Sequence, residues 1–195
     1  MSIAYRVSGW NRKRKWKLFL NIFKPNRSMR VLDVGYTEKE YSSTDNFIEK
    51  HYPFPENLTA LGINDAGTIS QRYPKVKFVQ YTGKIFPFKD KEFDLCWSNA
   101  VIEHVGSRND QLYYLMEIKR VSNRAFLTTP NKYFPIEVHT RTPFIHFLPK
   151  DLFDRYLCLI GKKWGTGSYM NLLGKADFRK LLELARIEHY PSVPM

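Results

Sequence analysis

The sequence predicts an α/β fold: a doubly wound, mostly parallel β-sheet with helices on both faces. Short apolar runs that suit strands buried on both faces alternate along the chain with segments of helical character. Such alternation favours right-handed crossovers between parallel strands. It also predicts a ligand crevice at the carboxyl ends of the strands.

The expected strands cover, in chain order, residues 30–34, 58–63, 76–80, 92–97 and 124–128, with a last strand around 186–190. The first helix is expected over residues 10–23, because Trp16, Phe19, Leu20 and Phe23 recur at the i, i+3, i+4, i+7 spacing of one helical face, and Pro25 ends it. The other helices are expected at residues 44–51, 66–72, 107–121 and 175–185.

The 195 residues suffice for one domain with a full core. We expect a basic amphipathic helix over residues 1–25 and a main domain over residues 26–195. Within the main domain, residues 130–170 are rich in proline, aromatic residues and glycine, so an irregular insertion or lid is expected there.

Positive charge is concentrated near the N-terminus. The net charge is +12, and residues 1–30 hold nine Lys or Arg and no Asp or Glu, which leaves +3 for the rest. Three interpretations stay open for the basic residues 6–30: contact with an anionic membrane surface, contact with RNA phosphates, or a helix whose apolar face packs on its own sheet. The first would make a cytoplasmic protein peripheral at the membrane.

Cysteine usage points to a reduced, cytoplasmic protein. Cys96 and Cys158 lie far apart and have no metal-ligand spacing. The longest apolar run near the N-terminus, LFLNIF, is far shorter than the roughly 20 residues that span a bilayer, and no small-residue cleavage site follows it. Neither a transmembrane helix nor a secretory signal is therefore expected.

Four segments in a fixed order resemble one enzyme family. They are VLDVG, LTALGIND, VKFVQYTGKIFPFKDKEFDLCWSNAVIEHV and RAFLTTPN, and together they cover roughly residues 28–131. This order is similar to that of class I S-adenosylmethionine (SAM)-dependent methyltransferases with the type-11 domain, which have a Rossmann-like fold. The most specific part is FPF, then EFD, then SNAVIEHV.

The resemblance implies a set of cofactor-binding residues at the strand ends. A glycine loop after the first strand lets backbone approach the methionyl part of SAM, and here the chain departs from the family by having Thr37 and Lys39 at later glycine positions. A carboxylate or amide after the second strand would bind the ribose hydroxyls, although the sequence NDAG equally suits a turn and helix cap. The implied residues are Asp33, Gly35, Tyr36, Asn64, Asp65, Thr82, Gly83, Ser98 and Asn99.

The resemblance also implies an acceptor site. His104 would act as the catalytic base or hold the acceptor, since its ordinary pKa suits proton transfer at neutral pH, although a structural role at a turn is equally open. Glu103, Asn131 and His139 are the implied substrate residues. Ala100 stands where a metal-binding relative of this motif has its first Glu, so no metal is expected.

These features predict a SAM-dependent methyltransferase that acts on an unidentified acceptor. The altered glycine loop favours an alternative, a methyltransferase-like binding or membrane-docking module without catalysis. The positive charge favours a further alternative, an RNA methyltransferase.

Overall fold

The computed structural model describes residues 3–135, 142, 144–167 and 170–188. Its contacts divide the chain into two compact units. Of the described residues, the first unit contains those up to Ser98 together with Ile118–Phe126, and the second contains Asn99–Glu117 and those from Leu127 to Glu188.

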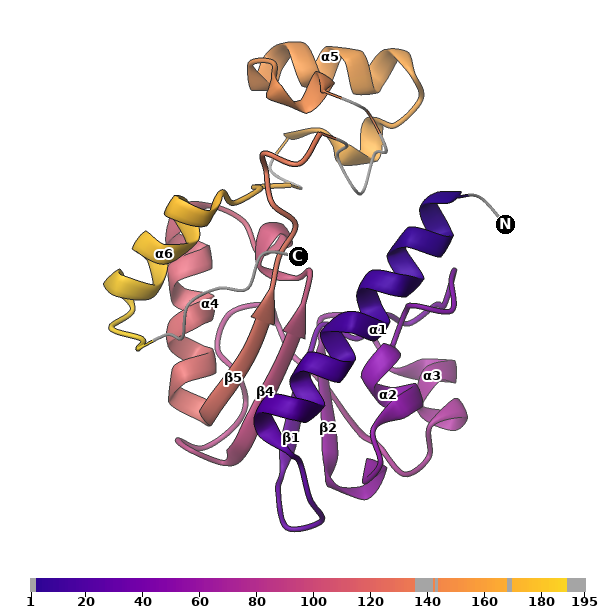
Figure 1. Cartoon of the computed structure of the whole chain (residues 1–195), viewed down its shortest axis with the longest axis vertical. Helices are drawn as coiled ribbons and strands as arrows, with labels where there is room; N and C mark the ends of the chain where they lie inside the picture. The colour runs from indigo at the N-terminus through magenta and orange to yellow at the C-terminus, as the bar shows by residue number, and fades with distance from the viewer. Residues whose placement is uncertain (1–2, 136–141, 143, 168–169, 189–195) are drawn as a thin grey trace. The chain divides into compact units, whose positions relative to one another are not determined.

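The first unit is built on a five-stranded parallel sheet of order β3-β2-β1-β4-β5 (Figure 1). Its strands are β1 (Val31–Val34), β2 (Leu58–Gly62), β3 (Lys77–Gln80), β4 (Phe93–Asn99) and β5 (Ser122–Thr128), and the last residues of β4 and β5 enter the second unit. The predicted parallel sheet is confirmed. β1 and β2 are buried along their whole length, as their unbroken apolar runs indicate.

Helix α1 (Ile3–Phe23) packs its apolar face on this sheet (Figure 1). Phe19 is fully buried, and its ring lies 5.1 Å from Trp97 on β4 and 5.7 Å from Phe126 on β5. Phe23 and the partly buried Trp16 belong to the same core cluster. The apolar face of α1 therefore packs on its own sheet, as one of the three interpretations of this helix expects. Only the basic face is left to contact a membrane surface or RNA.

Three shorter elements complete the first unit. Helix α2 (Phe47–His51) and the 3-10 helix η1 (Pro55–Asn57) lie between β1 and β2, and α3 (Gly67–Arg72) follows β2. Ile48 of α2 and Ile69 of α3 are buried in the core cluster, and α2 also buries Phe47, whose ring lies 6.1 Å from that of Trp16.

The second unit contains the remaining helices: η2 (Ile102–His104), α4 (Arg108–Val121, which ends in the first unit), η3 (Ile145–Phe147), α5 (Lys150–Leu159), η4 (Lys163–Gly165) and α6 (Lys175–Leu184). The expectation of an irregular segment over residues 130–170 was wrong where α5 forms. That helix buries Phe153 and Leu157, one turn apart, in a small cluster with Met170.

The strand expected around 186–190 is not present in its described part, residues 186–188. Arg186 has a left-handed φ of 52°, and Ile187 N donates to Leu182 O at 2.9 Å. These features end α6 with a helical cap that turns the chain away from an extended path. Residues 189 and 190 lie outside the described residues.

Across the described ranges, every helix is too short or too polar to cross a lipid bilayer.

Candidate functional site

The carboxyl ends of the strands in the first unit meet at one edge of the sheet. The register pairs Val34 of β1 with Leu61 of β2 and with Ser98 of β4, and it pairs Gly62 with Gln80 of β3. The loops after β1, β2 and β3 therefore start side by side. This edge brings together seven of the residues implied by the resemblance: Gly35, Tyr36, Asn64, Asp65, Thr82, Gly83 and Ser98.

Tyr36 ties the loop after β1 to the end of β2. Gly35 before it has a φ of 111°, which favours glycine, and Gly35 N donates to Leu61 O at 2.8 Å. The buried Tyr36 hydroxyl donates to the carbonyl of Asn64 at 2.5 Å. A Cβ on Gly62 would lie 2.6 Å from the Tyr36 ring, so this ring also requires glycine on β2.

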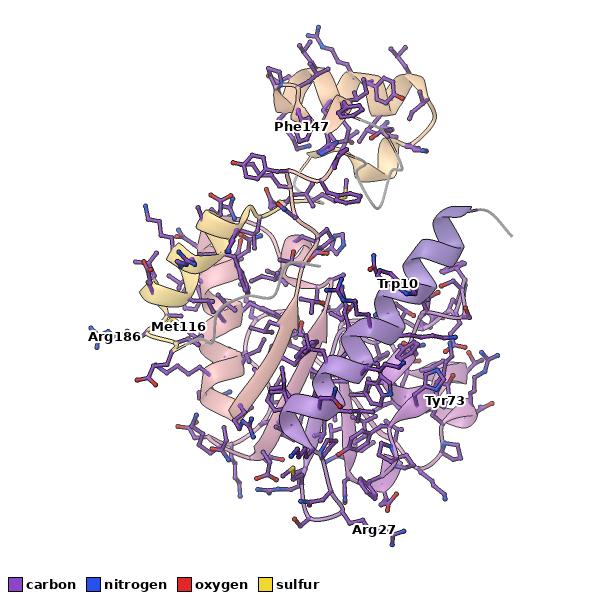
Figure 2. The ribbon with its side chains drawn as sticks, viewed as in Figure 1. Trp10, Arg27, Tyr73, Met116, Phe147 and Arg186 are labelled. Atoms are coloured by element: carbon purple, nitrogen blue, oxygen red, sulfur yellow. The ribbon has the colours of Figure 1, made fainter. Side chains whose placement is uncertain are left out.

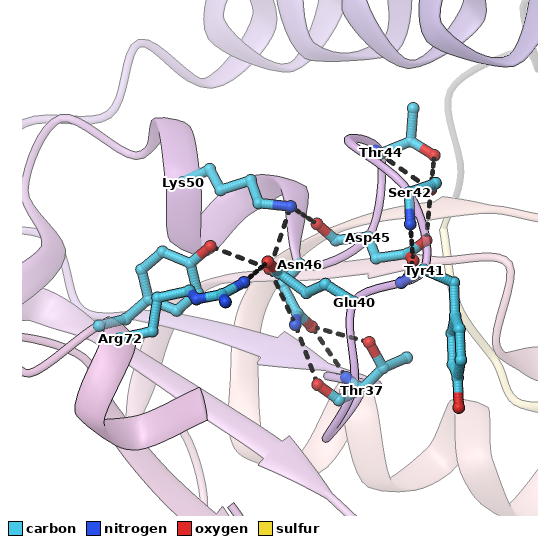
Figure 3. A network of polar contacts seen from close by, with 10 residues as sticks. Thr37, Glu40, Tyr41, Ser42, Thr44, Asp45, Asn46, Lys50 and Arg72 are labelled. Carbon is cyan, nitrogen blue, oxygen red and sulfur yellow. Dashed lines mark hydrogen bonds and ion pairs between the residues drawn. The ribbon is translucent and has the colours of Figure 1, made fainter. Parts of the chain in front are cut away.

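The rest of this loop is held by side chains rather than by glycine conformations (Figure 3). Thr37 N donates to Asn46 Oδ1 at 2.8 Å, and Asn46 Nδ2 donates to Thr37 O at 2.9 Å. Asn46 itself takes a left-handed φ of 45°, which asparagine tolerates better than most residues. The side-chain amide therefore pairs with the Thr37 backbone at a position where the family pattern has glycine.

Glu40 anchors the outer part of the same loop (Figure 3). Its carboxylate accepts a hydrogen bond from the Tyr73 hydroxyl at 2.9 Å, lies 3.0 Å from Lys50 Nζ and pairs with Arg72. Burial opposes ionisation of Glu40, but the hydrogen bonds from Lys50, Tyr73 and Arg72 prevail and lower its pKa. The loop is thus closed by a charged network on α2 and α3.

Asp33, the acid of the first motif, is buried in β1 rather than exposed at the edge. Burial, together with repulsion from the buried Glu49 of α2, raises the pKa of Asp33 well above its ordinary value. Burial also raises the pKa of Glu49, although a side-chain hydrogen bond with Asp33 opposes that rise. Arg12 of α1 lies close enough to lower the pKa of Asp33 in part.

This acid pair predicts a stability that falls as pH rises. Because the folded-state pKa values are raised, the folded protein holds protons that the unfolded chain releases above about pH 4. We expect Glu49→Gln to raise the melting temperature by a few degrees near pH 8 and to flatten its decline between about pH 5 and pH 8. Melting curves across this range measure it, with the exposed Glu38→Gln as the control. An unchanged slope in Glu49→Gln would contradict the raised pKa values.

Two large apolar side chains, Ile63 and Ile85, are exposed in the segments that follow β2 and β3, and together with Gly83 we call them the shelf. Ile63 is 62% exposed and Ile85 is 73% exposed, although both are large and apolar. Gly83, two residues before Ile85, has a φ of 87°, and a Cβ there would meet only Ile63 Cγ2, at 3.7 Å. The side chains of Asn64 and Asp65 are exposed beside this shelf, and Asp65 Oδ1 accepts the Gly67 amide of α3 at 3.3 Å. Asp65 thus supports the helix start while Asn64 faces solvent.

A second group of implied residues gathers in the second unit, after β4. Thr128 Oγ1 donates to Asn99 Oδ1 at 2.9 Å, and Ala100 N donates to Thr128 O at 2.8 Å. Ala100 has a left-handed φ of 57°, a conformation that costs free energy and often marks a functional turn.

Glu103 and His104 lie directly after this turn, in η2. Glu103 is fully buried, and its Oε2 accepts the Thr129 hydroxyl at 3.0 Å. His104 Nε2 lies 4.0 Å from Glu103 Oε1, and the His104 side chain is partly exposed. A histidine beside a buried carboxylate can accept a proton, because the carboxylate stabilises the imidazolium.

Asn131 and His139 are the other two implied substrate residues. Asn131 forms a β-bridge with Leu173, and its Oδ1 accepts the Tyr133 amide at 3.1 Å. His139 lies outside the described residues. In the described part of the chain, no three His, Cys, Asp or Glu side chains are grouped as a metal site would require.

The sequence did not identify Asn46 and Glu49 as residues of this region. It also did not show that Arg12 lies close enough to Asp33 to lower the pKa of that carboxyl. Asn46 precedes a helix and could have been interpreted as a polar cap, but its bond to Thr37 spans nine residues. Glu49 follows the apolar Phe47 and Ile48, but a carboxylate is seldom buried, so its sequence position alone does not predict burial.

Comparison with known proteins finds a matching family model and structures of the same fold. Residues 47–124 match a family model described as a methyltransferase domain. The predicted resemblance is thereby confirmed over this stretch. The matched part of this methyltransferase-like chain starts at α2 and ends in β5, so it includes the strand ends that carry Asn64, Thr82 and Asn99.

Solved structures share the fold. A SAM-dependent methyltransferase from Thermotoga maritima superposes with a TM-score of 0.58 at 12% identity, covering 96% of this chain and 74% of that one. The YcgJ protein of Bacillus subtilis gives 0.53 at 14% identity, covering 89% and 68%. A SAM-dependent methyltransferase from Methanosarcina mazei gives 0.51 at 17% identity, covering 83% and 81%. At these identities the likeness shows the fold alone. A comparison with curated proteins finds no match.

Proposed function

We propose that the chain binds SAM at the carboxyl edge of its sheet and transfers the methyl group to an acceptor that is still to be identified. The observation that carries this proposal is the shelf of Ile63, Gly83 and Ile85 beside the exposed Asn64 side chain. Large exposed apolar side chains next to polar groups suit a flat, partly polar ligand such as adenosine.

The residues at this edge fit the adenosyl part of SAM. Ile63 and Ile85 would contact the adenine ring, and the absence of a Cβ at Gly83 leaves room for it. The side-chain amide of Asn64 would bind the ribose hydroxyls, since it can both donate and accept. The exposed Thr82 would supply a further hydroxyl group along the same edge, whereas the Ser98 side chain is buried at the end of β4.

The loop after β1 fits the methionyl part of SAM less well. Asn46 already occupies the Thr37 amide, so this backbone donor is engaged before any ligand arrives. Gly35 keeps the conformation that the approach of a ligand to the backbone requires. We therefore expect binding through the adenosyl part with a weaker contribution from the loop. The closed loop is also the observation that favours the second candidate, a binding module without catalysis.

Bound SAM would supply an electrophilic methyl group on its sulfonium. The chain itself would orient the acceptor and take its proton, and we assign the second task to His104. The Thr129 hydroxyl donates to Glu103, which holds this carboxylate beside the imidazole. A proton taken by His104 would then be stabilised by the Glu103 charge.

Asn64→Ala tests the binding half of the proposal. We expect it to weaken S-adenosylhomocysteine (SAH) binding about tenfold, because two hydrogen bonds worth about 0.5–1.5 kcal/mol each are lost. The Tyr36 contact survives, since it uses the Asn64 backbone carbonyl. Isothermal titration calorimetry measures the change, with the exposed Asn109→Ala as a matched control.

Calorimetry of the unaltered protein decides between the two candidates. Saturable heat with SAM and SAH supports the enzyme. A folded protein that gives no heat with either ligand at millimolar concentration would overturn SAM binding and leave the binding module.

A further inference from the structure

Large apolar side chains are exposed together in one segment of the second unit. Isolated exposed apolar residues are common on protein surfaces, but a cluster of them usually marks an interaction site. Within residues 144–160 six such side chains are exposed: Phe144, Phe147, Leu148, Leu152, Leu159 and Ile160. Figure 2 labels Phe147, which lies in η3 just before α5. We call this set the apolar patch.

Helix α5 shows that the patch is separate from the core of its unit. Phe153 and Leu157 face the small cluster with Met170. Leu152, Arg155 and Leu159, spaced i, i+3 and i+7, lie on the opposite face. Leu159 is 85% exposed, so this face has no partner of its own among the described residues. The helix is therefore apolar on two sides, and its own unit covers only one.

Basic residues border the patch. Residues 144–163 contain four Lys or Arg and two Asp, and both acids lie on α5. One acid, Asp154, is paired with Lys150 on the same helix. Arg155 lies between the two exposed leucines, and Lys163 is exposed shortly after Ile160. The surroundings of the patch thus carry a net positive charge.

We propose that the apolar patch docks on an anionic phospholipid surface. Exposed Phe and Leu side chains would enter the interface, and the neighbouring cations would meet phosphate headgroups, the combination that interfacial helices use. RNA suits this surface less well, since four of the six patch side chains are aliphatic and offer no ring on which bases can stack. The apolar face of α1 is buried in the sheet core, so the patch, not that face, would supply the apolar contacts.

Vesicle co-sedimentation of the full chain tests the proposal. We expect binding to vesicles of mixed phosphatidylglycerol and phosphatidylcholine, and little binding to phosphatidylcholine alone. Leu152→Gln combined with Leu159→Gln should weaken the binding at least about tenfold, because two apolar side chains lose their burial in the interface. Leu184→Gln, an exposed leucine on α6 of the same unit, is the matched control and should leave binding unchanged.

Three outcomes would overturn the proposal. The first is no binding to anionic vesicles by the folded protein. The second is that the double variant still binds vesicles, whereas a variant with Lys13→Gln and Lys17→Gln on α1 does not. That result would place the membrane contact on the basic helix. The third is that the unaltered protein forms a dimer in light scattering and does not bind vesicles, while the double variant is a monomer. That result would assign the patch to contact with a second copy of the chain. Melting curves of all variants check folding, and none of these results depends on SAM binding.

Discussion

Phe19→Ala should lower the free energy of unfolding by about 3–5 kcal/mol, the largest stability change that we expect from a single substitution in this protein. Its ring is fully buried and lies within 6 Å of the rings of four others: Trp16 at 5.4 Å, Phe23 at 5.2 Å, Trp97 at 5.1 Å and Phe126 at 5.7 Å. Truncation leaves a cavity between α1 and two strands that no neighbour can readily fill.

Thermal and urea unfolding measure this loss, and the melting temperature should fall by about 6–20 °C. Ile22→Ala is the matched control, because Ile22 lies on the same helix and is exposed. It should change stability by no more than about 0.5 kcal/mol. Equal, small effects of both substitutions would show that α1 is not part of the folded core.

His104→Gln should lower methyl transfer about a hundredfold, the usual contribution of a positioned general base, while SAH affinity stays within a few-fold. Gln keeps a side chain of similar length but cannot take the proton at neutral pH. The measurement is transfer of a radiolabelled methyl group from SAM to fractionated cell extract, with calorimetry on the same samples.

His51→Gln on α2 is the control, since it replaces the same residue type at an exposed position in the other unit. Its transfer rate should equal that of the unaltered protein. Unchanged transfer by His104→Gln would remove the base from the proposal. Equal losses of transfer and SAH affinity would make His104 a residue that holds the cofactor.

The sheet could be predicted because its physical signal is local. β1 and β2 are buried on both faces, and a run such as VLDV shows that burial in four letters. The prediction of a strand around 186–190 was wrong in its described part. The helix before it ends with Arg186 in a left-handed conformation, and arginine seldom adopts that conformation, so the sequence does not indicate this cap. Helix α5 was missed because the surrounding prolines and aromatic residues suggested irregular structure.

The candidate site could be predicted only in part. The strand ends follow from the topology, so Gly35, Asn64 and Thr82 could be placed at one edge from the sequence alone. The closure of the loop by Asn46 could not, because it depends on a side-chain amide meeting a backbone nine residues away. The meeting of the buried Asp33 with Glu49 depends likewise on where α2 packs, which no local pattern encodes.

The two cysteines differ in a way that makes the protein convenient to label. Cys96 is fully buried in β4, and burial raises the pKa of its thiol well above the ordinary value, whereas Cys158 is exposed on α5 next to Leu159. Since the thiolate is the reactive form, a maleimide dye should attach to Cys158 alone in the folded protein. One surface thiol thus offers a fluorescent reporter within the apolar patch without any engineering of the chain. Reaction of the second thiol would then record global unfolding.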